Sequence, residues 1–352
     1  MEIAEKKAGK YLKGNKELII DKVMKNLLKM QKKHNLKIGK NKSYMYKNGV
    51  IFHLLYLSES LVYSEPELFL DALNWGKIYM PSIKIPTDHI TMTLTVIKNV
   101  LEEIMPDNIR KPAIKYIEEG IYKMDSFNTE IDSFLEKNET LKKESKKYLQ
   151  LLLDNDRMGA SRLITALVDK GVKIQDIYLE IFQNTQYELG RLWHTGIISV
   201  AQEHYCTAST QLIMSQLYPY IFQNHKKENV FVGACVSDEL HEIGIRMLSD
   251  ILELNGWDTY YLGANTPVDS IIKTILDNNA KLLGLSATMT YHVEKIEQQI
   301  EAIRKNMDCR DVKIIVGGYV FNLSDSLWKK IGADGYGKDI SDSLVKINNL
   351  TH

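Results

Sequence analysis

A glutamate, a histidine and a glycine follow an apolar run in the stretch CVSDELHEIGIRML (235–248) of the 352-residue chain. Glu239 lies two residues before His241, and Gly244 lies three residues after it. A histidine can bind a metal through one ring nitrogen while a nearby carboxylate accepts the proton of the other nitrogen. A nucleotide site would need a glycine-rich turn here, and that turn is absent. The spacing favours a metal ligand with a supporting acid, although a lone histidine in a loop is more often structural.

Strands alternating with helices surround this stretch. Because their sizes match βα units, these segments predict a five-stranded doubly wound parallel sheet of flavodoxin-like type over 228–352. Ligands of such sheets bind at the carboxyl ends of the strands. The predicted strands are 230–236, 257–263, 282–287, 313–318 and 333–337, and the predicted helices are 241–254, 267–279, 291–305, 324–330 and 339–349.

Small residues and hydroxyls lie where two further strands end. Ser286 and Thr288 follow the third predicted strand, and Gly317 and Gly318 follow the fourth. Together with Gly244, these residues predict a deep slot beside the sheet. A flat heterocycle on a long tail could fill this slot while His241 reaches a metal at its mouth.

These residues resemble the cobalamin (B12)-binding domain family, whose motif is acid-x-His-x-x-Gly, then Ser-x-Leu/Thr, then Gly-Gly. The resemblance implies that His241 is the lower cobalt ligand and that Glu239 is its hydrogen-bond partner. It also implies that Gly244, Ser286, Thr288, Gly317 and Gly318 line the pocket for the nucleotide tail. Glu239 departs from the aspartate that is commoner in this family.

The segment before the sheet, residues 146–225, predicts a four-helix bundle with short connections. Asp156 is typical of a helix N-cap and Gly171 of a helix C-cap. Ser199 and Gln202 form a capping-box pattern that begins the fourth helix. In the cobalamin-binding family such a bundle caps the upper face of the corrin ring.

Within the bundle, LWHTGIISVAQEH (192–204) brings a tryptophan, a carboxylate and two imidazoles to one helix–turn–helix. Each of the four residues has an ordinary structural reading: Trp193 can be core, and Glu203 is favoured near a helix N-terminus. The joint pattern of Trp193, His194, Glu203 and His204 is similar to the CarH-type light-sensing branch. That resemblance implies bound adenosylcobalamin, with Trp193, Glu203 and His204 around the adenosyl group. His194 would bind cobalt after light breaks the cobalt–carbon bond.

Two functions follow from this pattern. The first is a B12-dependent photoreceptor or sensor that does not act as an enzyme and that signals by a conformational switch. The alternative is a corrinoid carrier protein that shuttles methyl groups for a methyltransferase system. The tryptophan, the Glu-His pair and Glu239 favour the sensor, because the carriers usually keep the upper face open and have aspartate in the first motif.

Residues 1–127 predict an all-helical sensor or interaction domain, and 128–145 a helical linker. Helices are expected at 44–63, 66–79, 87–105 and 110–124. The opening helix weakly resembles globin-like sensor domains, and no equivalent of the CarH DNA-binding module is found. His53 and His89 are candidates for binding a second chromophore or haem, although a histidine in an apolar helix is more often a core residue.

Composition limits the partners. The chain has 45 Lys and Arg against 45 Asp and Glu, so nothing draws it to nucleic acid or to an anionic membrane. Its three cysteines have no metal-binding spacing and make no disulfide framework. No apolar run is long enough to span a membrane. We therefore expect a cytoplasmic protein whose partners are cobalamin and either a protein or further copies of the chain.

Overall fold

The computed structural model describes residues 2–33, 40–137, 140–222 and 229–351. Contacts divide the chain into two compact units. The first contains residues 1–129 and 323–330, and the second contains residues 130–322 and 331–352.

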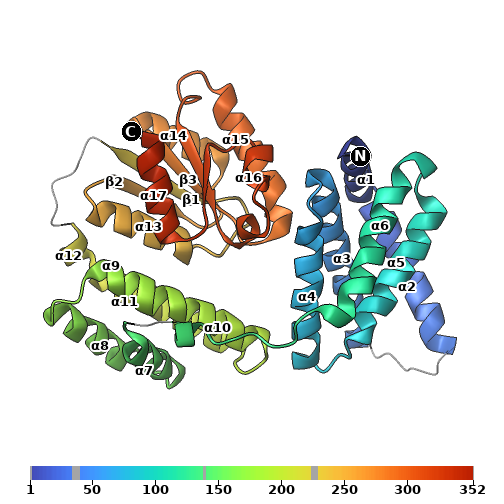
Figure 1. The fold of residues 1–352 in the computed structure, drawn as a ribbon, viewed down its shortest axis with the longest axis horizontal. Coiled ribbons are helices and arrows are strands. Elements are labelled where there is room, and N and C mark those ends of the chain that lie inside the picture. Colours follow the sequence, from blue (N-terminus) through green and yellow to red (C-terminus); the bar gives the residue numbers. More distant parts are fainter. Residues whose placement is uncertain (1, 34–39, 138–139, 223–228, 352) are drawn as a thin grey trace. The chain divides into compact units, whose positions relative to one another are not determined.

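The first unit is all-helical (Figure 1). In α5 the buried residues Ile90, Leu94, Ile97 and Leu101 recur every three or four positions, so one face of the helix joins the core. None of the described helices is long and apolar enough to cross a membrane. The helices are α1 Glu2–Gly14, α2 Lys16–Lys33, α3 Lys40–Tyr63, α4 Pro66–Ser82, α5 Asp88–Ile104 and α6 Asp107–Lys123, and α16 Leu327–Lys330 groups with them.

The connecting segment differs from the helical linker expected over 128–145. Residues 128–133 have no regular structure, a short 3-10 turn covers Phe134–Lys137, and helix α7 begins only at Lys142. The reason is a set of contacts to the bundle. The backbone N–H of Phe134 donates to the carboxylate of Glu188, the Phe134 ring packs on Tyr187, and Leu135 is buried.

The second unit begins with the helical bundle. Its helices are α7 Lys142–Leu153, α8 Arg157–Asp169, α9 Ile174–Asp176, the π-helical segment η3 Ile177–Gln183, α10 Asn184–His194, α11 Val200–Gln216 and the short α12 Tyr218–Ile221. Both predicted N-caps are present. The side chain of Asp156 accepts a hydrogen bond from the N–H of Gly159, and Ser199 and Gln202 form a reciprocal capping box.

The five-stranded sheet has the order β2-β1-β3-β4-β5, and every pairing is parallel. This confirms the predicted fold class. The α13–α17 and α14–α15 pairs cover opposite faces of the sheet (Figure 1). The strands are β1 Val230–Cys235, β2 Asp258–Gly263, β3 Leu282–Ser286, β4 Lys313–Gly317 and β5 Gly335–Gly337, and the helices between and after them are α13 Ile243–Leu254, α14 Val268–Asn278, α15 Val293–Lys305 and α17 Ile340–Thr351.

One apolar core joins the bundle to the sheet. Tyr178 and Phe182 of η3 belong to the same buried cluster as Met247 and Ile251 of α13 and Ile347 of α17. The bundle therefore packs on the face of the sheet that α13 and α17 cover. The chain order reverses between β1 and β3, so the expected ligand position is at the carboxyl ends of these two strands.

Candidate cofactor site

Glu239 lies at the carboxyl end of β1, and its carboxylate is fully buried. Oε1 accepts hydrogen bonds from the backbone N–H groups of Leu240 and His241, and Oε2 accepts from those of Thr288 and Met289. Burial alone would raise the pKa of Glu239, but these bonds and those from two imidazoles outweigh it and hold the pKa far below its usual range. The carboxylate of Glu239 therefore links the segments that follow β1 and β3.

His241 presents its imidazole beside this carboxylate. Its Nδ1 lies 2.5 Å from Oε1 of Glu239, and its side chain is 60% exposed. The hydrogen bond to Glu239 raises the pKa of His241. Because the carboxylate accepts the proton of Nδ1, Nε2 is the nitrogen left to bind a metal. The buried thiol of Cys235 donates to the backbone oxygen of His241, with a sulfur–oxygen distance of 3.5 Å.

A second histidine, which the motif did not predict, lies at this carboxylate. His292 is buried, and its Nδ1 lies 2.9 Å from Oε2 of Glu239. It ends the 3-10 turn Thr290–His292 that precedes α15. A signal was present in the sequence, since His292 closely follows the third predicted strand and the carboxyl ends of parallel strands meet at one edge of a sheet.

The small residues lie as predicted at neighbouring strand ends. Ser286 of β3 pairs with Cys235 of β1 on one side and with Gly317 of β4 on the other. Gly318 has φ +101°, and a Cβ there would lie 2.1 Å from the carbonyl oxygen of Ala287. A Cβ on Gly244 would meet no atom within 4 Å, so the start of α13 faces open space. Thr288 lies at the same edge and is half-buried.

Helix α11 brings an exposed face of the bundle toward this edge. Val200, His204, Ala208 and Leu212, spaced four residues apart, are all exposed. Beside this stripe, Nε2 of Gln211 donates to Oε1 of Glu242 at 2.8 Å, and Glu242 directly follows His241. The charge of Glu203 is also among the causes that raise the pKa of His241. The hydrogen bond from Gln211 therefore connects α11 to the residue that follows His241.

The four residues predicted for the upper face have different environments. Glu203 and His204 are partners, with 2.6 Å between Oε2 and Nδ1, and the hydroxyl of Thr207 donates to Oε1 of Glu203. Trp193, by contrast, packs against the bundle core, and His194 is only 7% exposed. Of the four residues, only His204 has an exposed side chain.

The chemistry of these residues fits a corrinoid. An exposed imidazole has one nitrogen held by a charged acid, a glycine beside it leaves space, and a helical face lies opposite. No group of three or more His, Cys, Asp or Glu that could form a conventional metal site occurs among the described residues. A corrin needs no such group, because its ring supplies most of the cobalt ligands and the protein supplies one or two.

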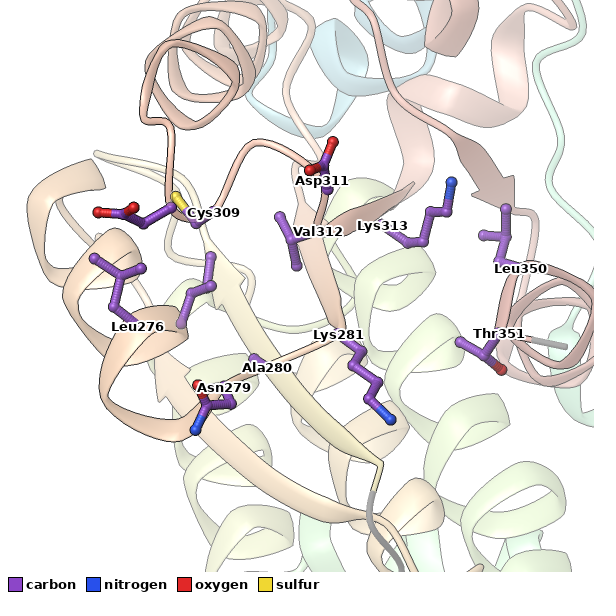
Figure 2. Close-up of a pocket in the computed structure, with 12 residues that line it drawn as sticks. Leu276, Asn279, Ala280, Lys281, Cys309, Asp311, Val312, Lys313, Leu350 and Thr351 are labelled. Atoms are coloured by element: carbon purple, nitrogen blue, oxygen red, sulfur yellow. The ribbon is translucent and has the colours of Figure 1, made fainter.

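The pocket in Figure 2 is a different feature, at the opposite end of the sheet. It is lined by Lys281 just before β3 and by Lys313 at the start of β4, together with Cys309 and residues that end α14 and α17. Glu239 and His241 follow the carboxyl end of β1, so this pocket has no part in the candidate site.

The two histidines suggested for a haem or chromophore have other environments. The hydroxyl of Tyr46 lies 2.7 Å from Nδ1 of His89, and the two rings stack. His53 is buried, and burial lowers its pKa to about 4. A second cofactor in the first unit has no support from the comparisons below.

The sheet order, the buried acid with its exposed histidine and the bundle above them define a cobalamin-binding protein. Two family models described as B12 binding domains match the chain, one over residues 229–345 and the other over residues 145–218. The chain belongs to this B12-binding family.

Corrinoid proteins named after methylamines are among the proteins to which this chain is similar. Dimethylamine corrinoid protein 2 of Methanosarcina acetivorans is 28% identical over 47% of this chain and 74% of its own length. Dimethylamine corrinoid protein 3 of Methanosarcina mazei is 30% identical over 35% of this chain and 73% of its own length. The structure of the Methanosarcina barkeri monomethylamine corrinoid protein shares the fold, with a TM-score of 0.52 and 20% identity over 60% of this chain and all of that one.

These relatives overturn the photoreceptor interpretation. Light sensing and light-driven signalling are wrong for this chain, and the basis for His194 as a cobalt ligand after light disappears with them. The physical reason is that a tryptophan and a Glu-His pair also fit ordinary bundle packing. Trp193 packs on the core, and Glu203 hydrogen-bonds along its own helix to Thr207.

Proposed function

We propose that this chain is a corrinoid carrier protein, which holds a cobalt corrinoid and passes a methyl group between methyltransferase partners. The Glu239–His241 pair beside an exposed helical face carries the proposal, and the relatives named dimethylamine corrinoid proteins support it. The upper ligand would then be a methyl group in place of 5′-deoxyadenosyl. Catalysis would belong to the partner enzymes and not to this chain.

When bound, the corrinoid supplies a cobalt centre that accepts a methyl cation equivalent and gives it up again to a nucleophile. His241 would hold the cobalt from below through Nε2, and Glu239 would keep the proton on Nδ1. Gly244, Ser286, Thr288, Gly317 and Gly318 would line the slot for the nucleotide tail.

The upper face would belong to the bundle. Glu203 and His204 would lie near the upper side of the corrin, because they lie on α11 and Gln211 of the same helix donates to Glu242, the residue after His241. Trp193 and His194 would support this turn from the core. The exposed stripe of α11 leaves space for a methyl group, which is what a carrier needs.

Spectroscopy tests the proposal directly. The protein is loaded with hydroxocobalamin, reduced to the cob(I)alamin state, and mixed with a candidate methyltransferase and monomethylamine, dimethylamine or trimethylamine in turn. Amine-dependent loss of the cob(I)alamin absorbance is the expected result. Controls omit the amine or use His241→Ala. A protein that binds cobalamin but loses no absorbance with any amine would contradict methylamines as methyl donors, and one that binds no cobalamin would contradict the whole proposal.

A further inference from the structure

Glu242 has contacts that the site described so far does not use. It directly follows His241, and its carboxylate connects three parts of the second unit. Oε1 accepts from Gln211 of α11, and Oε2 accepts from the hydroxyl of Tyr261 in β2 at 2.8 Å and from the N–H of Ala264 at 2.9 Å. The loop that carries His241 is thus tied to the bundle and to the strand next to β1.

The Gln211–Glu242 contact is the first of three along one face of α13. Glu242, Arg246 and Asp250 are spaced four residues apart, and each contacts the bundle; we call these contacts the polar seam. Nη2 of Arg246 donates to the hydroxyl of Ser215 at 2.7 Å. The hydroxyl of Tyr178 donates to Oδ2 of Asp250 at 2.8 Å.

The three contacts of the polar seam differ in how deeply they are buried. Tyr178 and Asp250 are buried, whereas Gln211 and Glu242 are only half-buried. A buried hydrogen bond whose partner is lost costs more than one whose groups can turn to water. The contact at Asp250 is therefore the costliest of the three to lose, whereas the contact beside His241 is only partly shielded from water and the Arg246–Ser215 contact is exposed.

The loop before α13 is fixed on both sides of His241. On one side Glu239 is buried among its six donors, and its backbone oxygen accepts from the N–H of Asn265 at 3.0 Å. On the other side the loop depends on Glu242, whose contact with Gln211 is the half-buried end of the polar seam. A change at Gln211 therefore reaches the residue next to His241 without disturbing Glu239.

We propose that Glu242 is a positioning residue for His241 and that Gln211 makes this position depend on the bundle. A displacement of α11, such as a partner at the upper face would cause, then loosens the lower imidazole through the Gln211–Glu242 hydrogen bond. This inference rests on the proposed role of His241 as cobalt ligand. It adds that a movement of α11 on one face of the corrin would change the position of His241 on the other face.

The test compares two cross-seam variants, one turn apart on α11. Gln211→Leu removes the donor that α11 gives to Glu242. Ser215→Ala removes one acceptor of Arg246, whose Nη2 also donates to the hydroxyl of Tyr218 at 3.4 Å. Each protein is titrated with cob(II)alamin, and the nitrogen splitting in its electron paramagnetic resonance spectrum gives the fraction of cobalt that carries the imidazole. We expect Gln211→Leu to lower this fraction and to raise the Kd about tenfold, which corresponds to about 1.4 kcal/mol. Ser215→Ala should stay within about twofold of the native Kd, since this contact is exposed and water can replace the lost hydroxyl.

Equal changes in the two variants would show a general weakening of the polar seam and would overturn the proposal, as would a native spectrum in Gln211→Leu. Glu242→Gln is a second variant, which leaves α11 intact. We expect its imidazole-bound fraction and its Kd to lie between those of the native protein and Gln211→Leu. If the native protein itself binds cobalamin without an imidazole signal, the proposed role of His241 fails first. The two failures are therefore distinguishable.

Discussion

His292 contacts the carboxylate of Glu239 from the side opposite His241, with 2.9 Å between Nδ1 and Oε2. One buried charge is thus shared by an exposed imidazole and a buried one. The exposed ring can bind a metal, while the buried ring fixes the direction of the carboxylate. Substitutions of the two histidines should therefore affect cobalamin binding and the free energy of unfolding differently.

Replacing His241 by alanine should remove the lower cobalt ligand. We expect bound cob(II)alamin to lose its imidazole nitrogen signal and cobalamin affinity to fall by about tenfold or more, because the metal–imidazole bond is lost. His89→Ala, in the first unit, is the matched control and should bind as the native protein does. An unchanged spectrum in His241→Ala would reject the assignment.

Replacing His292 by leucine should leave Oε2 of Glu239 without its side-chain donor. The free energy of unfolding should fall by about 1–3 kcal/mol, the usual effect of leaving a buried charged acceptor less satisfied. His292→Asn keeps an N–H donor and should recover part of the loss. Urea unfolding of the cobalamin-free protein measures both, and equal losses would show that packing alone matters at this position.

Alanine substitutions at Gly318 and Gly244 should have opposite effects on stability. Gly318→Ala should destabilise the protein by about 2 kcal/mol or more, because φ is positive and the new Cβ would collide with Ala287. Gly244→Ala should raise stability by about 0.5 kcal/mol, since it lies in a helix and its Cβ meets nothing. We nevertheless expect Gly244→Ala to bind cobalamin more weakly. Unchanged binding in that variant would remove Gly244 from the proposed slot.

Asp250 should make stability depend on pH. Burial raises its pKa to about 6, and the hydroxyl of Tyr178 opposes the shift only in part. The folded protein then holds a proton that the unfolded chain has lost, so stability falls as the pH rises from about 4 to 6. The effect is about 3 kcal/mol at 1.36 kcal/mol per pKa unit.

Asp250→Asn keeps an acceptor for Tyr178 without the charge and should flatten this dependence. Urea unfolding at pH 4 and pH 7 measures it, with the exposed Asp308→Asn as control. If Asp250→Asn and the native protein lose stability equally between these pH values, the raised pKa is not the cause.

The sheet could be predicted to within about two residues at each strand end, because buried parallel strands are short apolar runs. The Glu239–His241 pair was predictable because both residues belong to one short local motif. His292 was missed because its contact with Glu239 spans 53 residues and depends on how two loops meet. Function was predicted wrongly from Trp193 and the Glu-His pair, since such residues fit a bundle core and a helix end as well as a ligand site.

The apolar cluster shared by the bundle and α13 has a consequence for modular inheritance. Residues such as Phe182 and Ile251 are buried together, so a gene fragment that begins at the first strand would encode a domain in which apolar side chains of α13 and α17 are exposed to water. Such a fragment should aggregate. Recombination that yields a folded protein is therefore expected to join segments before the bundle, near residue 130. The bundle and the sheet would then be inherited together.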